Sequence, residues 1–151
     1  MDEPRIYKKV NSGNFENDLA KLEKAHYRKD KKSRNEFNCL IEFYLNQITK
    51  EPYCKELIHL GVRAFIANEP LPVNVESNGF AFRKIRFSMP GLVKLARYGR
   101  LIYVVNDTHL LIFPISIYTH IEYPKRPPNK DLKREFSFIN EYMNENLDKV
   151  R

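Results

Sequence analysis

The residues with the clearest chemical potential lie between Ser77 and Asn106, a stretch without a single aspartate or glutamate. Every charged side chain in this stretch is cationic: Arg83, Lys84, Arg86, Lys94, Arg97 and Arg100. Cations without neighbouring carboxylates create a directed positive field, which attracts polyanions such as nucleic acids. The charge of the whole chain also favours polyanionic partners, since its formal net charge is +7 and its pI is about 9.4.

Tyr118, His120 and Tyr123 follow this basic stretch. Arginine and lysine can stabilise negative charge on a phosphorane, and a histidine or lysine whose pKa is lowered by nearby cations can take a proton. This set suits RNA cleavage, in which the 2′-hydroxyl group of the substrate is the nucleophile. Tyrosine rings can also stack on unpaired bases. A cationic face is more often a binding surface than a catalytic one, so binding without cleavage stays open.

Other chemistries lack their usual motifs. The chain has no carboxylate pair of the glycosidase kind, and no GxSxG, P-loop, GxGxxG or HExxH motif. The two cysteines and four histidines do not have the spacing of metal ligands. We therefore expect neither a metal nor another cofactor. The basic run at 26–34, HYRKDKKSR, is typical of a solvated surface, with a phosphate-binding arm as the alternative.

The elements that must position these residues begin with a short strand over residues 6–10. Apolar stripes with helical spacing predict an amphipathic helix from Asn14 to the basic run and a second one from Phe37 to Ile48, which Pro52 ends. Residues 53–78 indicate a turn of helix, loops and an edge strand around 71–75.

Three strands follow, over 80–87, 100–105 and 109–118. Pro114 lies inside the last of them and predicts a bulge or an edge-facing position, because proline has no N–H to donate. Side chains alternate between the faces of a strand, and the middle strand is apolar on both faces. Phe113, Ile115 and Ile117 would share one face of the last strand. The other face would be concave and would carry this set: Lys84, Arg86, Arg100, Ser116, Tyr118 and His120.

The C-terminal part predicts a stiff proline-rich linker followed by an amphipathic helix with Asp131 as its N-cap. We expect a domain over residues 1–125, with 126–151 as linker and helix of the same globular unit. No apolar run reaches the roughly 20 residues that span a bilayer. The first ten residues lack the apolar core of a signal peptide. A cytoplasmic location without membrane contact is therefore expected.

Three segments resemble a known family: KIRF at 84–87, YGRLIYVVND at 98–107 and LLIFPISIYTH at 110–120. Together they are similar to the RelE/ParE superfamily of toxins from bacterial toxin–antitoxin pairs. The upstream segments FENDLAKLEKAHYRKD and FNCLIEFYLNQITKEP resemble the helical hairpin of that family. The resemblance covers residues 5–125. It implies an α+β fold, in which an N-terminal helical hairpin packs on a small twisted antiparallel sheet, here with an added C-terminal helix.

RelE-like relatives are ribosome-dependent endoribonucleases that cleave mRNA. The resemblance implies that Lys84 and Arg86 bind the scissile phosphate, that Arg100 stabilises the transition state and that His120 transfers protons. Tyr123 would assist, and four further residues would contact RNA: Arg83, Lys94, Arg97 and Tyr118. The implied partners are mRNA on the ribosome and a small antitoxin protein, and a homodimer is a further expectation. Two alternatives stay open, a ParE-like inhibitor of DNA gyrase and a basic RNA- or ribosome-binding module without catalysis.

Overall fold

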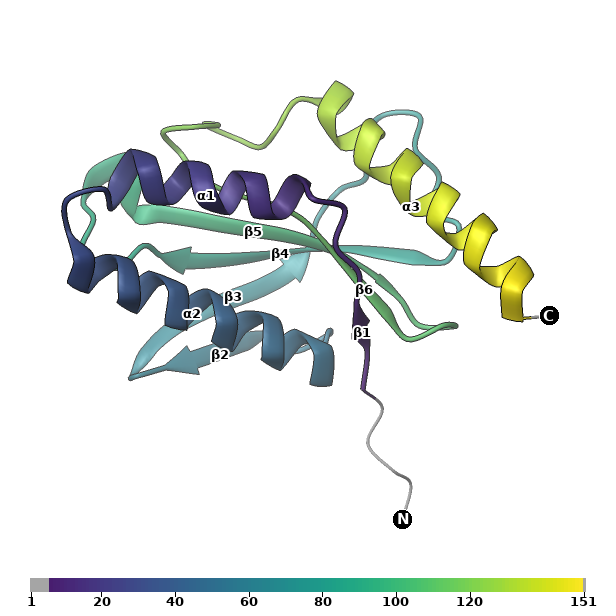
Figure 1. The fold of residues 1–151 in the computed structure, drawn as a ribbon, viewed down its shortest axis with the longest axis horizontal. Helices are drawn as coiled ribbons and strands as arrows, with labels where there is room; N and C mark the ends of the chain where they lie inside the picture. The colour runs from purple at the N-terminus through teal and green to yellow at the C-terminus, as the bar shows by residue number, and fades with distance from the viewer. Residues whose placement is uncertain (1–5, 151) are drawn as a thin grey trace, which may run out of the picture.

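The computed structural model describes residues 6–150, in which three long helices accompany a six-stranded sheet (Figure 1). Two ends lie outside the described part: residues 1–5, at the start of the predicted domain, and Arg151, at the end of the predicted linker–helix segment. The elements in chain order are β1 (Lys8–Lys9), α1 (Asn14–His26), α2 (Lys31–Lys50), β2 (Glu56–His59), β3 (Val62–Asn68), β4 (Phe80–Ser88), the 3-10 helix η1 (Lys94–Arg97), β5 (Tyr98–Asn106), β6 (Leu111–Thr119) and α3 (Asn129–Val150).

The sheet is mixed, with the strand order β1-β6-β5-β4-β3-β2. Strands β2 to β6 pair antiparallel with their neighbours, whereas β1 runs parallel to β6, with Lys8 opposite Leu111. The sheet is also strongly twisted and curled (Figure 1). The predicted fold, a helical hairpin on a small antiparallel sheet of the RelE/ParE kind, is therefore wrong. The broader expectation of a chain that mixes α and β structure is confirmed.

The main cause of this error is the hairpin of β2 and β3, which lies within the stretch predicted to be irregular. A two-residue turn joins the strands, with φ of 50° at Leu60 and 80° at Gly61. Such turns normally carry asparagine, aspartate or glycine, because both positions need positive φ. A leucine in the first position hides the turn from sequence reading. The predicted edge strand at 71–75 is irregular instead.

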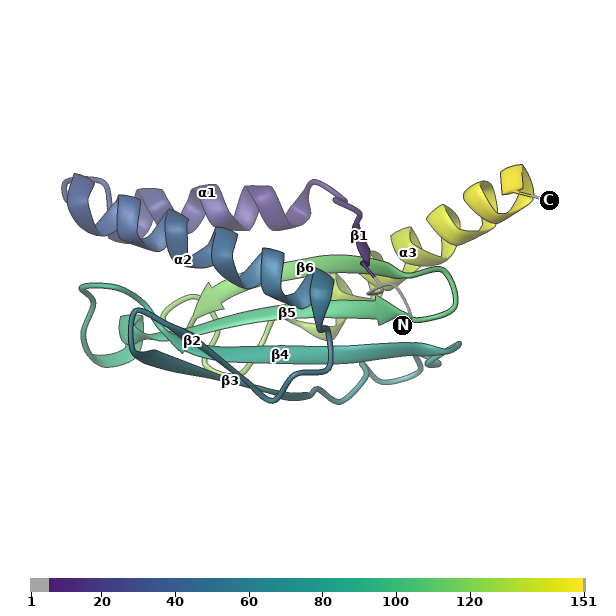
Figure 2. The ribbon, with the colours of Figure 1, turned by 90° about the horizontal axis from the view of Figure 1, so that it is seen from below.

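The two faces of the sheet are packed differently. The inner face lies beneath α1 and α2, which form a layer on one side of the sheet (Figure 2). Its buried side chains include Ile85 and Leu101, which belong to the same apolar cluster as Phe37 of α2. The outer face is apolar only at one end, where α3 covers it and the ring of Phe136 meets that of Phe82 edge-on at 5.4 Å. The other end of the outer face carries the polar residues described below.

The predicted irregularity at Pro114 is confirmed. Ile102 pairs with Ser116 but Tyr103 pairs with Pro114, which leaves Ile115 as the extra residue of a bulge. The bulge resets the alternation of β6, so the predicted common face of Phe113, Ile115 and Ile117 is wrong. Ile115 packs with Phe113 in the outer-face cluster, whereas Ile117 packs in the inner-face cluster.

The same bulge joins the start of α1 to the sheet. The Ser116 hydroxyl group donates to Asp18 Oδ2 at 2.6 Å, and Asn14 Nδ2 donates to the carbonyl oxygen of Ile115 at 2.8 Å. Ser116 was predicted to join the cationic face. It instead anchors a helix through a buried hydrogen bond.

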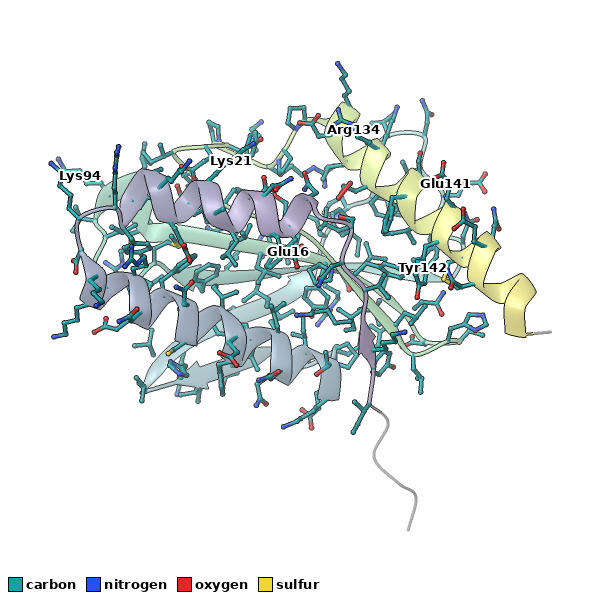
Figure 3. All side chains as sticks on the ribbon, in the orientation of Figure 1. Glu16, Lys21, Lys94, Arg134, Glu141 and Tyr142 are labelled. Atoms are coloured by element: carbon teal, nitrogen blue, oxygen red, sulfur yellow. The ribbon has the colours of Figure 1, made fainter. Side chains whose placement is uncertain are left out.

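The C-terminal helix begins at Asn129, three residues earlier than an N-cap at Asp131 would place its first residue. Asp131 is not its N-cap but lies in its first turn, where a negative charge is favourable near the helix N-terminus. On α3, the ring of Tyr142 contacts that of Phe113 edge-on at 5.7 Å (Figure 3). Within residues 6–150, no helix combines the length and the apolar character needed to cross a bilayer.

Gly99 is required by the packing of its cross-strand neighbour Phe87. A Cβ atom at Gly99 would lie 2.6 Å from the Phe87 ring, which is buried against Tyr44. We expect Gly99→Ala to lower the free energy of unfolding by about 1–3 kcal/mol, as overpacked cores do. Urea denaturation measures the change. Adding Phe87→Leu should recover most of the loss, and a Gly99→Ala variant as stable as the wild type would contradict the close approach.

Candidate functional site

Two arginines stand directly opposite each other on the open end of the outer face. Arg86 of β4 pairs with Arg100 of β5, and Arg100 pairs in turn with Tyr118 of β6. Like charges at directly opposed positions destabilise a sheet. Among residues 6–146, whose side chains the structure describes, neither arginine forms an ion pair, and the Arg100 guanidinium donates only to the carbonyl oxygen of Gly99, at 2.8 Å. The sheet therefore holds two uncompensated cations side by side.

The environment of Arg100 reflects this crowding. Burial lowers the pKa of Arg100 from its usual value, and the positive charge of Arg86 lowers it further. An arginine stays protonated despite such a shift, so the repulsion persists in the folded protein. An anion bound between the two guanidinium groups would relieve it.

His120 lies at the end of β6, beside Arg100. Its ring contacts that of Tyr98, with centroids 5.2 Å apart and an interplanar angle of 34°. Burial lowers the pKa of His120 below its ordinary value of 6.5, and the charges of Arg100 and Lys84 act in the same direction. The imidazole is consequently neutral at physiological pH and can accept a proton.

Exposed aromatic rings flank the arginine pair. Phe65 of β3 lies opposite Arg86 and is 55% exposed, while Tyr98 is exposed beside His120. By strand alternation, Arg63 shares the face of Phe65. An exposed phenylalanine ring beside cations offers a flat apolar surface on which a planar ligand can stack. We call this surface the arginine face; its members are Arg63, Phe65, Arg86, Tyr98, Arg100 and His120.

Lys84 lies next to the arginine face but, unlike Arg86, it is buried and its charge is paired with a carboxylate. Its ammonium group is 2.8 Å from a carboxylate oxygen of Glu69, and the two side chains are only 9% and 5% exposed. Arg126 of the proline-rich linker approaches the same oxygen at 3.2 Å. The sequence assigned Lys84 and Arg86 one shared role. The structure buries Lys84 in an ion pair and leaves Arg86 exposed.

The two tyrosines predicted near His120 lie beside the arginine face and contact each other. Tyr118 is fully buried, and its hydroxyl group donates to the carbonyl oxygen of Lys125 at 3.4 Å. Tyr123 packs edge-on against it, with ring centroids 5.6 Å apart. Burial raises the pKa of both phenols above its ordinary value, so both remain protonated. Tyr118 lies beside Arg100, as its partner on the neighbouring strand.

Arg83 belongs to the opposite, inner face of the sheet. Its guanidinium group donates to Asn68 Oδ1 at 2.9 Å and to the carbonyl oxygen of Cys54 at 3.0 Å, and it lies over the ring of Tyr53. The Nε atom is buried without a hydrogen-bond partner. Arg83 therefore ties β4 to the segment before β2 and does not join the arginine face.

Lys94 and Arg97 lie on η1, in the connection between β4 and β5. Lys94 projects at the end of the molecule where α1 is followed by α2 (Figure 3). Arg97 lines a pocket beside α2. The structure thus brings together Arg86, Arg100 and His120 beside Tyr118, and separates them from Arg83, Lys94 and Arg97.

Sequence reading missed three members of the arginine face. Arg63 and Phe65 went unnoticed because β3 was not recognised, although Val62, Ala64 and Ile66 alternate with them in a strand-like pattern. Tyr98 was quoted within a motif but not assigned to the site. Among the described residues, no group of three or more His, Cys, Asp and Glu side chains could hold a metal ion.

No family model, curated protein or solved structure matches this chain. The resemblance to RelE/ParE toxins accordingly stays a prediction.

Proposed function

We propose that the arginine face binds single-stranded RNA. The observation that carries this proposal is the opposed pair of Arg86 and Arg100, which has no carboxylate partner among the side chains described, those of residues 6–146. Guanidinium groups bind phosphate oxygens through paired, charge-assisted hydrogen bonds. A phosphate placed over the pair would meet both cations and remove their mutual repulsion.

The exposed rings favour a single strand over a duplex. Unpaired bases can stack on Phe65 and Tyr98, at about 1–3 kcal/mol for each base. Bases in a duplex are already stacked on one another and present only their edges. The same polymer can thus place phosphates on the arginines and bases on the flanking rings.

Fluorescence anisotropy of a labelled RNA tests the proposal. We expect a single-stranded RNA to bind at least about tenfold more tightly than the duplex of the same sequence, given the stacking contributions. Single-stranded DNA of the same sequence serves as the control for the sugar. The proposal fails if no RNA binds at moderate salt or if the duplex binds equally well.

The pH dependence of binding follows from His120. The lowered pKa leaves its ring neutral at pH 7.5, and the ring gains a charge only at a pH below the ordinary histidine value of 6.5. Affinity for RNA should then rise by roughly two- to fivefold, the contribution of an exposed ion pair. A His120→Gln variant should lose this rise while binding normally at pH 7.5. An unchanged pH profile in His120→Gln would show that another group titrates.

Cleavage of the bound RNA is the second candidate function, and the position of a neutral His120 beside Arg100 favours it. His120 would take the proton of a 2′-hydroxyl group, the 2′-oxygen would attack phosphorus, and the bond between phosphorus and the 5′-oxygen would break. The departing 5′-oxygen would take a proton from water, and His120 would return its proton to the solvent. Arg100 would stabilise the charge on the phosphorane. The products would be a 2′,3′-cyclic phosphate and a 5′-hydroxyl end, with no metal required.

End analysis of a labelled RNA incubated with the protein tests this reaction. Cleavage should stop when the 2′-hydroxyl group at the cut site is replaced by hydrogen, and it should stop in His120→Gln although RNA still binds. Intact RNA in every sample would leave the arginine face as a binding surface only.

The cellular setting that we propose is the one implied by RelE-like toxins, cleavage of mRNA on the ribosome with an antitoxin as regulator. Induced expression should then arrest growth, and primer extension should map cuts within translated mRNA. Supercoiling inhibition without RNA cleavage would favour the ParE-like alternative.

A further inference from the structure

A second surface of the molecule has the features of a protein-binding site. A pocket of about 620 Å³ lies between α2, the turn of the β2–β3 hairpin and the connection from β4 to β5. Its lining is mainly apolar and includes Leu40, Leu60, Val62, Met89 and Leu92. Since Val62 alternates with Phe65 along β3, the pocket opens on the opposite side of the sheet from the arginine face.

Leu60 is the most telling residue of this pocket. It occupies a turn position with positive φ, which is sterically unfavourable for leucine. Its apolar side chain is also 90% exposed to solvent. The neighbouring connection also exposes Val93 and Leu95. Several exposed apolar side chains around a hollow usually mark a site of interaction.

One cation and one carboxylate line the pocket, Arg97 and Glu36, and further cations lie around it. Arg97 forms no ion pair among residues 6–146, whose side chains the structure describes. Gly91 of the connection approaches Ser33 so closely that a Cβ atom there would lie 2.7 Å from Ser33 Oγ. This contact brings the cationic start of α2, with Lys31, Lys32 and Arg34, next to the pocket. Lys94 projects from the same end of the molecule (Figure 3).

The charge around the pocket distinguishes three possible occupants: a second copy of this chain, a nucleic acid and a peptide segment. A second copy of this chain, with a net charge of +7, would bring cations against a cationic rim. Nucleic acid would satisfy the rim but not the apolar interior. A peptide segment that carries a large apolar side chain between carboxylates satisfies both.

We propose that this pocket, which we call the Leu60 pocket, binds a segment of an acidic partner protein. One large apolar side chain of the segment enters between Leu60 and Met89, and flanking carboxylates reach Arg97 and Lys94. The site is independent of RNA binding, because its residues lie on the other side of the sheet.

Selection from a displayed library of random peptides against the full-length protein tests the proposal. We expect enrichment of peptides with a large apolar residue flanked by aspartate or glutamate. The enriched peptides, labelled and measured by fluorescence anisotropy, should bind Leu60→Asn and Arg97→Glu at least about tenfold more weakly than the wild type. Peptides without acidic flanks, or no enrichment at all, would overturn the proposal.

The Leu60→Asn variant is informative because asparagine suits this turn better than leucine. Its melting temperature should equal or exceed that of the wild type, so a loss of peptide binding cannot come from unfolding. Val73→Asn, which changes another exposed apolar residue on the irregular segment between β3 and β4, is the matched control and should bind peptide normally. Equal peptide binding by the wild type and Leu60→Asn would also overturn the proposal.

Discussion

Replacing Arg86 and Arg100 together by glutamine is expected to weaken the binding of single-stranded RNA by at least about a hundredfold. Each hydrogen bond to a charged group contributes about 1.5–3 kcal/mol, and about 1.4 kcal/mol corresponds to tenfold in affinity. The slope of log affinity against log salt should become shallower by about 1.4, since each phosphate contact with a single strand contributes about 0.7. Anisotropy titrations at several salt concentrations measure both quantities.

This double variant should fold at least as well as the wild type, because it removes two like charges at directly opposed positions of the sheet. Its thermal stability separates a loss of contacts from a loss of structure. Arg28→Gln/Arg34→Gln is the matched control, since it removes the same charge from the basic run at 26–34. A control variant that loses as much affinity as the double variant would place the RNA on that run instead.

Strand alternation was sufficient to predict the core of the arginine face. Arg86, Arg100 and Tyr118 meet because β4, β5 and β6 pair in the antiparallel order that their sequences indicate, and His120 follows at the end of β6. Local patterns decide such neighbours, since the side-chain period of a strand is two.

The number of strands could not be predicted in the same way. The β2–β3 hairpin depends on a turn with a leucine where asparagine, aspartate or glycine is usual, and so its two strands were not predicted. The short first strand predicted over residues 6–10 is confirmed by β1, but its parallel pairing with β6, with Lys8 opposite Leu111, could not be predicted because a two-residue strand has no pattern that selects a partner. The hairpin enlarged the predicted small antiparallel sheet, and the parallel pairing of β1 made it mixed.

The state of Lys84 was equally hidden from the sequence. Glu69 follows β3 and reaches Lys84 because β3 pairs with β4, with Ala67 opposite Lys84, and Arg126 reaches the same carboxylate from the linker. No spacing rule links these three residues. Their contact depends on how a loop and a linker cross the outer face.

The buried carboxylate of Glu69 leads to the second large effect. Replacing Glu69 by alanine leaves the Lys84 ammonium group without its partner in a site where the side chain is 9% exposed. Removing one member of a buried ion pair usually costs about 3–5 kcal/mol, because the remaining charge is not solvated. We expect Glu69→Ala to lower the free energy of unfolding by that amount in urea denaturation. Lys84→Met should cost less, because Arg126 still pairs with Glu69.

The double variant Glu69→Met/Lys84→Met shows whether Lys84 belongs to the RNA-binding surface. It removes one positive and one negative charge, so the net charge next to Arg86 does not change. Apolar side chains of similar size often replace a buried ion pair without loss of stability, and the double variant should therefore be about as stable as the wild type. If the pair is structural, RNA affinity should change by no more than about twofold. This change is smaller than the largest contribution that an exposed ion pair makes to affinity. A tenfold loss of affinity in a stable double variant would instead assign the Lys84 ammonium group to phosphate binding, the role that the sequence predicted for it. The ion pair with Glu69 would then have to open when RNA binds.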